Sequence, residues 1–262
     1  MLTDRAKLTI SCGDCSYIPK VDNAGMIAED KYQIMHNGIK VVKGGYHGDW
    51  MTTIIRDLKG HHEPQEEKAF YEVLKDIPPQ ATMIELGSNW SYYSMWFNKE
   101  VENPTNIMIE PNEEKLKAGK INFDINNMEG KFAQASVGRE PLRNTNFVDW
   151  DGKSYTLDQT SIDNIRKEYN LDTVDIVHSD IQGAEYDMLL GSLDSIEEQK
   201  INYFFISTHG QHVHEYCMRF LKNKNFYILC SHTEEESYSA DGLIVASQHP
   251  GKEIQISRRG RE

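Results

Sequence analysis

The sequence contains no apolar run that approaches the roughly 18 residues needed for a membrane-spanning helix. Its first residues, MLTDR, also lack the apolar core of a secretory signal, so we expect a cytoplasmic protein with no membrane span. Hydrophobic residues make up 39% of the chain and occur in regular short runs, which argues against disorder. A chain of 262 residues is long enough to bury the core of one domain with an N-terminal elaboration.

Basic residues are few, since 28 Lys and Arg stand against 41 Asp and Glu and leave a net charge of −13. A surface this acidic repels phosphate backbones, so we expect no nucleic-acid partner. The one basic cluster, formed by Arg258, Arg259 and Arg261, is predicted to belong to a solvated C-terminal tail. No pattern in the sequence indicates an oligomeric state.

The four cysteines do not form a metal-binding or redox framework. Cys12 and Cys15 form a C-x-x-C pair, but Cys217 and Cys230 stand alone on separate elements and supply no second pair. The strand and helix that flank the pair in thioredoxin-like proteins are missing as well. We therefore expect reduced thiols and commit to no metal site.

Strand and helix patterns alternate from residue 82 onward, which predicts an α/β fold with a mostly parallel sheet and helices on both faces. The last two strands follow each other without a helix, so the last should run antiparallel. Seven strands in this arrangement are typical of the Rossmann-like class I sheet of S-adenosylmethionine-dependent methyltransferases. Strands are predicted near 82–86, 106–110, 132–136, 174–179, 202–207, 225–230 and 241–247. Helices are predicted near 91–99, 112–127, 160–168, 184–197 and 212–223.

The chain is predicted to have three parts, of which residues 1–79 form an N-terminal layer on the core. That layer comprises an irregular arm over 1–30, a hairpin over 32–42 with Asn-Gly at its turn, and helices over 49–58 and 64–74. Residues 80–250 form the sheet domain, and 251–262 the tail. An Asp151-Gly152 turn signal predicts a small hairpin insertion within 139–157.

Two short apolar runs end in acidic residues about 25 positions apart, and together they predict a nucleoside site. Glu110 follows the second run, where its carboxylate can accept both ribose hydroxyls, and Gly87 in the first loop lets the backbone approach the ligand. The loop lacks a complete G-x-G-x-x-G and has no Lys or Arg for a pyrophosphate. S-adenosylmethionine, a nucleoside without phosphate, therefore fits better than a dinucleotide.

Some of the residues predicted to bind this cofactor have a second possible role. Glu85 could contact the methionine ammonium group or only cap the following helix. Ser136 could hydrogen-bond the adenine amine, and we expect Trp90 to pack in the core rather than line the pocket. The full predicted set is Glu85, Gly87, Ser88, Asn89, Glu110, Ser136 and Asp180.

Histidines and an aspartate near two strand ends predict the catalytic group. One strand should carry His178 and Asp180 to the ligand-binding edge of the sheet, and the next should carry His209 there. Methyl transfer is an in-line displacement that needs positioning and a base near the acceptor hydroxyl, which suits these side chains. A magnesium ion held by Asp180 and a neighbour remains an open alternative. His212 and His214 lie on different sides of a helix and are not expected to share a metal.

The motifs resemble those of the FkbM-like methyltransferases, whose pattern runs Asp-x-Gly-Ala-Asn-x-Gly, Glu-Pro, Val-Gly, Leu-Asp and Asp-x-x-Gly-x-Glu. The resemblance extends over residues 60–247. It implies O-methylation of a sugar or other small-molecule hydroxyl, with S-adenosylmethionine as donor. Two positions depart from the pattern: Ser91 replaces the last glycine of the loop, and His178 stands where the family usually has lysine. The matching segments are Glu85–Ser91, Glu110-Pro111, Val137-Gly138, Leu157-Asp158 and Asp180–Glu185.

Two other functions remain open on the sequence alone. A non-catalytic binding or scaffold protein with the same fold is suggested by Trp90 and Ser91, and a nucleotide-dependent oxidoreductase is weakened by the missing glycine spacing. The sequence does not name the acceptor. We expect its pocket to be shaped by Tyr46, Trp50, His61, His62 and the 139–157 insertion.

Overall fold

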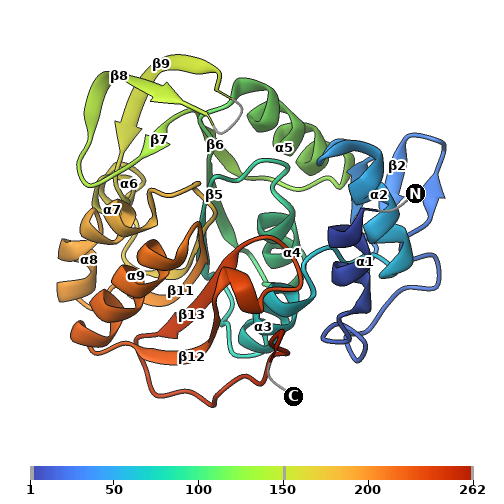
Figure 1. Cartoon of the computed structure of the whole chain (residues 1–262). Helices are drawn as coiled ribbons and strands as arrows, with labels where there is room; N and C mark the ends of the chain where they lie inside the picture. The colour runs from blue at the N-terminus through green and yellow to red at the C-terminus, as the bar shows by residue number, and fades with distance from the viewer. Residues whose placement is uncertain (1–2, 150–151, 261–262) are drawn as a thin grey trace.

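A seven-stranded sheet forms the centre of the protein (Figure 1). The computed structural model describes residues 3–149 and 152–260, so Asp151 of the predicted turn and Arg261 of the basic cluster lie outside the described residues. The strands lie in the order β12-β13-β11-β10-β4-β5-β6. They are β4 (Thr82–Leu86), β5 (Thr105–Ile109), β6 (Lys131–Ala133), β10 (Val174–Ser179), β11 (Ile201–Thr208), β12 (Tyr227–His232) and β13 (Gly242–Ser247).

Only one strand of this described sheet runs against the others. β13 pairs antiparallel with both β11 and β12, whereas the remaining pairs are parallel. The predicted seven-stranded, mostly parallel sheet with an antiparallel last strand is therefore confirmed. β4, β5, β10 and β11 end at the same edge of the sheet, and β13 begins there.

Helices cover both faces of the sheet, and each face has its own apolar core. Ile176 and Phe205 belong to the core shared with α3, α4 and the N-terminal layer, whereas Val177 and Phe204 belong to the core shared with α6, α7 and α9. The split follows from the alternation of side chains along a strand. The helices are α3 (Pro64–Leu74), α4 (Tyr92–Glu100), α5 (Glu113–Ile125), α6 (Ile162–Glu168), α7 (Glu185–Leu190), α8 (Leu193–Glu197) and α9 (Gln211–Asn223).

The helix predicted over 184–197 is in fact two short helices, α7 and α8. Gly191 ends α7, and a Cβ atom at this position would lie 2.4 Å from the carbonyl oxygen of Gly138. Only a residue without a side chain allows this approach of the two backbones. The helical spacing of apolar residues continues across the break, which explains why it was not predicted.

The N-terminal layer contains one helix that was not predicted. Residues 1–30 were expected to be irregular, but α1 spans Asp4–Ser11, with the Thr3 hydroxyl accepting a hydrogen bond from the backbone N–H of Ala6. The helix is short and only weakly amphipathic, so its periodicity is hard to detect. The layer also holds β1 (Ile27–Ala28), the predicted hairpin of β2 (Tyr32–Ile34) and β3 (Lys40–Val42), and α2 (Gly48–Asp57).

The insertion between β6 and β10 forms a small sheet beside the main one (Figure 1). The strand predicted over 132–136 divides into β6 and β7 (Ser136–Val137), and β7 pairs with β9 (Ser154–Thr160). β9 pairs in turn with β8 (Leu142–Val148), which gives the predicted hairpin.

We expected the C-terminal tail to be solvated, but part of it packs against the rest of the protein. The backbone N–H of Ile254 donates to Leu229 in β12, and that of Ser257 donates to the Asp14 carboxylate. Arg259 itself is exposed. None of the described helices is long and apolar enough to cross a membrane.

Candidate functional site

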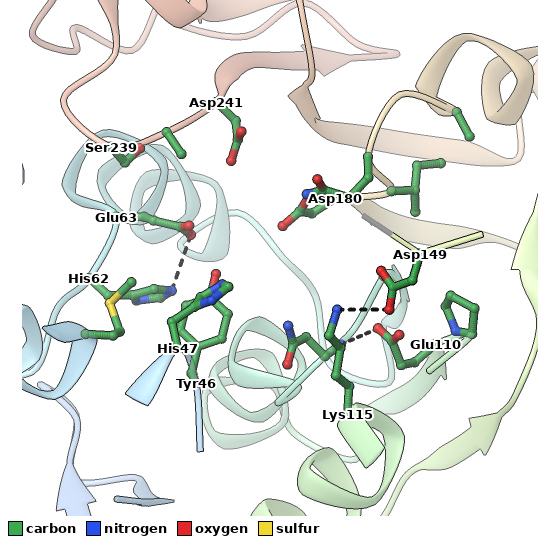
Figure 2. A pocket seen from close by; sticks show the side chains of 18 of the residues that line it. Tyr46, His47, His62, Glu63, Glu110, Lys115, Asp149, Asp180, Ser239 and Asp241 are labelled. Atoms are coloured by element: carbon green, nitrogen blue, oxygen red, sulfur yellow. Dashed lines mark hydrogen bonds and ion pairs between the residues drawn. The ribbon is translucent and has the colours of Figure 1, made fainter. Parts of the chain in front are cut away.

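A cavity of about 440 Å³ lies at the edge of the sheet where the parallel strands end (Figure 2). Gly87, Glu110 and Asp180 line it, and each directly follows one of the strands β4, β5 and β10. Ligands of open α/β sheets bind at this edge. Further walls come from the N-terminal layer, the insertion and the loop before β13, and include Tyr46, Trp50, His62, Glu63, Asp149 and Asp241.

The loop after β4 approaches the end of β10 very closely. Gly87 has a φ of +71°, and a Cβ atom there would lie 1.8 Å from the carbonyl oxygen of Asp180. The backbone N–H groups of Gly87 and Ser88 both donate to the carbonyl of Ile109 at the end of β5. The absence of a side chain at Gly87 therefore allows the ends of β4, β5 and β10 to lie close together at the base of the cavity.

Glu110 is held in one position by two backbone groups. One carboxylate oxygen accepts from the N–H of Asn89 at 3.0 Å, and the other from the N–H of Asn112 at 2.8 Å. Burial raises the pKa of Glu110 to about 7, although both hydrogen bonds oppose the rise. Asn89 adopts a left-handed conformation, with a φ of 44°, which asparagine tolerates with little penalty. A buried, oriented carboxylate of this kind can accept hydrogen bonds from vicinal hydroxyls.

The predicted cofactor residues divide into two groups in the structure. Glu85 and Ser88 are buried and do not line the cavity. Glu85 accepts a hydrogen bond from the backbone N–H of Ser94 in the first turn of α4, so the structure gives it the helix-capping role. Burial raises the pKa of this carboxyl to about 7. The members that line the cavity are Gly87, Asn89, Glu110, Ser136 and Asp180.

Trp90 packs in the core, as expected. Its side chain is 5% exposed and stacks on Tyr46 at a ring-centroid distance of 4.6 Å, and it does not line the cavity. Tyr46 does line the cavity, together with Trp50 and His62. These three residues therefore reach the cavity, and their role in holding an acceptor stays a prediction.

His61 does not line the cavity, contrary to expectation. It is fully buried and pairs with Glu67 in α3. Its neighbour His62 lies between Glu67 and Glu63, and Glu63 lines the cavity wall (Figure 2). Burial lowers the pKa of His62, but the two carboxylates outweigh burial and raise it to about 10. The N-terminal layer thus presents an imidazolium–carboxylate pair to the cavity.

Asp180 and His209 come together at the edge of the sheet, as predicted. The Nε2 atom of His209 lies 3.3 Å from Asp180 Oδ1 and 3.3 Å from Asp241 Oδ1, and its Nδ1 lies 2.7 Å from Glu185 Oε1. Burial lowers the pKa of His209, but these acidic neighbours outweigh burial and raise it to about 9. Burial also raises the pKa of Asp180 and Asp241 above the usual range. We call Asp180, His209 and Asp241 the rim triplet.

Asp241 was not predicted as a site residue, although its position in the sequence indicates that it could be one. The last strand was predicted to be antiparallel, and such a strand begins where its parallel neighbours end. Residues just before it therefore lie beside the ends of β10 and β11, and an aspartate there is a candidate site residue. Asp149 and Lys115, whose side chains lie 3.6 Å apart on the opposite wall, carried no such signal.

The predicted position of His178 at the edge of the sheet is wrong. The residue lies within β10, is 3% exposed, and its Nε2 is 2.8 Å from Glu66 Oε1. Its ring packs against Tyr93 and Phe205 and does not line the cavity. Successive strand residues point to opposite faces, so His178 points into the core shared with α3.

A profile of the family described as the methyltransferase FkbM domain matches residues 45–228 of the chain. The chain belongs to this family of S-adenosylmethionine-dependent methyltransferases. The matched region contains the loop after β4, Glu110 and the Asp180–Glu185 segment. No curated protein matches the chain.

Several solved structures are similar to the chain at low sequence identity. A precorrin-6y C5,15-methyltransferase from Geobacter metallireducens is 11% identical, with a TM-score of 0.44, over 69% of this chain and 86% of that chain. TrmK from M. capricolum, bound to S-adenosylhomocysteine, is 14% identical, with a TM-score of 0.43, over 74% and 71%. A methyltransferase from Aquifex aeolicus is 12% identical, with a TM-score of 0.40, over 69% and 88%.

Proposed function

We propose that this FkbM-family protein transfers the methyl group of S-adenosylmethionine to a hydroxyl oxygen of a sugar or another small molecule. The observation that carries the proposal is the cavity at the carboxyl edge of the sheet, with Glu110 on one side and Asp180 and Asp241 of the rim triplet on the other. His209 lies behind these two carboxylates, 3.3 Å from each, and does not itself line the cavity. Glu110 can recognise the ribose of the cofactor, and the rim carboxylates can act on the hydroxyl of the acceptor. The net charge of −13 favours a small acceptor over a nucleic acid.

The residues present fit a nucleoside cofactor. Glu110 is buried and oriented to accept from ribose hydroxyls, and Gly87 lines the same cavity. Ser136 supplies a hydroxyl to the same cavity. When bound, S-adenosylmethionine supplies an electrophilic methyl group.

The acceptor hydroxyl must be held and its proton drawn away for its oxygen to attack. Asp180 and Asp241 place negative charge at the edge of the cavity, and the buried carboxylate of Glu185 orients His209 between them. Trp50, which is 38% exposed, and Tyr46 offer aromatic surface on the opposite wall for the body of the acceptor. These are the roles that we assign to the two sides of the cavity.

The alternative of a non-catalytic scaffold protein was suggested by two residues, and the position of neither supports it. One was the side chain of Ser91 in a crowded loop, but Ser91 lies against α5 and does not line the cavity. The other was Trp90, which also packs outside the cavity. Neither residue obstructs the proposed cofactor site.

Calorimetric titration of the purified protein with S-adenosylmethionine, S-adenosylhomocysteine and NAD⁺ tests the proposal. We expect the first two to bind in the micromolar range and NAD⁺ not to bind. A screen of sugar and small-molecule hydroxyls with methyl-labelled donor then identifies the acceptor. Binding of NAD⁺ in preference to the other two would favour an oxidoreductase, and binding of none of the three would favour a scaffold.

A further inference from the structure

The rim triplet draws its three side chains from neighbouring strands of the sheet. Asp180 follows β10, His209 follows β11, and Asp241 precedes β13, which lies next to β11. One potential ligand atom from each residue lies within 4.8 Å of the other two. A mixed set of two carboxylates and one imidazole on a rigid sheet edge is a donor set that divalent metal ions use.

Two of the three distances within the rim triplet are compatible with atoms that share an ion. A charge-assisted hydrogen bond between imidazolium and carboxylate is about 2.7–2.9 Å long. The two distances from His209 Nε2, to Asp180 and to Asp241, are both 3.3 Å. Neighbouring ligands about 2.1 Å from a common ion are about 3.0 Å apart in octahedral and about 3.4 Å apart in tetrahedral geometry. The observed spacing falls within that interval.

The other nitrogen of His209 makes the contact that metal-binding histidines usually make. Its Nδ1 lies 2.7 Å from Glu185 Oε1, and Glu185 is fully buried. A carboxylate that accepts from Nδ1–H fixes the ring and directs Nε2 at the rim, where a divalent ion would replace the Nε2 proton. The Gln182 amide nitrogen lies 2.7 Å from Nε2. Rotation of this amide by 180° would place its oxygen where the nitrogen now lies, and the oxygen could then serve as a further metal ligand.

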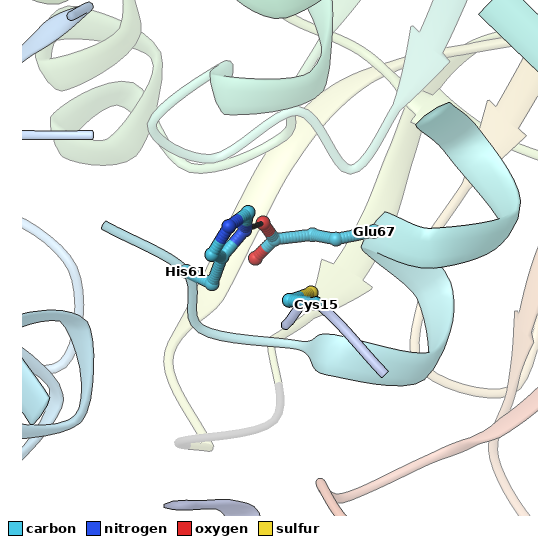
Figure 3. A group of neighbouring side chains, drawn as sticks. All are labelled: Cys15, His61 and Glu67. Atoms are coloured by element: carbon cyan, nitrogen blue, oxygen red, sulfur yellow. Dashed lines mark hydrogen bonds and ion pairs between the residues drawn. The ribbon is translucent and has the colours of Figure 1, made fainter. Parts of the chain in front are cut away.

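A second group of possible ligands in the protein shows the opposite pattern. Cys15, His61 and Glu67 are buried together within the N-terminal layer (Figure 3). His61 is directly hydrogen-bonded to Glu67, and the Cys15 thiol donates to the carbonyl of Pro64 at 3.3 Å. Glu67 also accepts from the backbone N–H of His62 at 2.7 Å. The direct His61–Glu67 hydrogen bond and the Cys15–Pro64 contact hold this cluster together without an ion.

We propose that the rim triplet of Asp180, His209 and Asp241 binds one divalent metal ion, with Gln182 as an additional ligand. This proposal rests on the proposed methyl transfer to a hydroxyl and gives the triplet a specific task in it. The acceptor oxygen coordinates the ion, the O–H bond breaks, and the oxygen keeps the electron pair while the proton passes to solvent water. The oxygen can then form its bond to the methyl carbon as the carbon–sulfur bond of the donor breaks.

The test is a titration of the purified full chain with Mn²⁺ alone, followed by the loss of the electron paramagnetic resonance signal of free Mn²⁺. We expect one ion per chain. Asp241→Asn should weaken binding at least tenfold, and Mg²⁺ should compete with Mn²⁺. The matched control is Asp187→Asn, which removes an exposed carboxylate from α7 and should leave Mn²⁺ affinity unchanged. His209→Asn tests the same prediction if Asp241→Asn does not fold.

The failure of this proposal can be told apart from the failure of the proposed function. Binding of S-adenosylmethionine without binding of Mn²⁺ overturns the metal site alone, as does Mn²⁺ binding that is equal in the wild type and the two rim variants. Binding of Mn²⁺ at the triplet without binding of S-adenosylmethionine supports the metal site and overturns the methyltransferase function. Calorimetry with S-adenosylhomocysteine on Asp241→Asn should give the wild-type affinity, because we place Asp241 on the acceptor side.

Discussion

The hydroxyl of Ser91 occupies the space that Gly119 leaves free on the facing helix α5. A Cβ atom on Gly119 would lie 2.4 Å from Ser91 Oγ and 3.1 Å from the carbonyl oxygen of Asn89. Ser91 itself has a φ of 61°, a conformation that favours glycine. The serine that departs from the family pattern is thus accommodated by a missing side chain 28 positions later in the sequence.

This relationship predicts opposite effects of two small substitutions. Ser91→Gly should stabilise the protein by about 1 kcal/mol, because it relieves the left-handed backbone and removes a buried hydroxyl that has no partner among the described residues. Gly119→Ala should destabilise it by about 1–3 kcal/mol through the clash with Ser91. Denaturant unfolding measures both. In the double variant the cost of the Gly119→Ala change should shrink, and strict additivity would contradict the proposed contact.

Removal of the Glu110 carboxylate should weaken S-adenosylmethionine binding strongly. In Glu110→Ala we expect at least a tenfold loss of affinity, which corresponds to about 1.4 kcal/mol or more, because hydrogen bonds to a charged acceptor are among the stronger ones. Calorimetry measures the loss. Glu113→Ala removes an exposed carboxylate from the first turn of the adjacent helix and serves as the control. Unchanged affinity in a folded Glu110→Ala protein would rule out the ribose-binding assignment.

The same carboxylate should make cofactor binding depend on pH. Its pKa is raised to about 7 by burial, so it is mostly protonated at pH 6 and mostly ionised at pH 8. The ionised form accepts from both ribose hydroxyls, and affinity should therefore fall roughly tenfold as the pH drops from 8 to 6. Glu110→Gln should bind weakly with a flat profile over this range. An equally steep profile in that variant would assign the titration to another group.

Glu85 should make folding stability depend on pH in a predictable direction. Its pKa is raised from 4.5 to about 7 in the folded protein, so its contribution is fully present below pH 4.5 and is lost as the pH rises through 7. Glu85→Gln keeps an oxygen for the N–H of Ser94 and avoids the buried charge. The variant should gain stability over the wild type by about 2 kcal/mol between pH 5 and pH 8. Denaturant unfolding at the two pH values measures this gain, which the exposed control Glu113→Gln should not show.

The strands and helices of the sheet domain could be predicted from the sequence because each carries a strong local pattern. The apolar runs that became β4 and β10 were predicted with their observed bounds, since both are buried on both faces and flanked by turn residues. The helix α1 and the break at Gly191 could not be predicted. The first is short, and the second depends on a contact with Gly138 that only the folded chain makes.

Part of the candidate site could be predicted from the sequence, because some of its residues directly follow strands with strong local patterns. Glu110 and Asp180 follow strands directly, so the strand pattern alone brings them to the binding edge. The direction of a side chain within a strand is harder to predict, and His178 was misplaced for that reason. Glu63 and Asp149 line the cavity from segments far away in the sequence, and no local pattern links them to the sheet.

One wall of the cavity brings together parts of the chain that are made at very different times. The hydroxyl of Thr9 in α1 donates to the carbonyl of Tyr238 at 2.7 Å, across 229 residues, and Thr9 lines the cavity with Asp241. The residues at the base of the cavity, Gly87, Glu110 and Asp180, precede β11 in the sequence. Tyr238 and Asp241, which this wall requires, follow β11. This wall is therefore completed only after β13 has paired with β11.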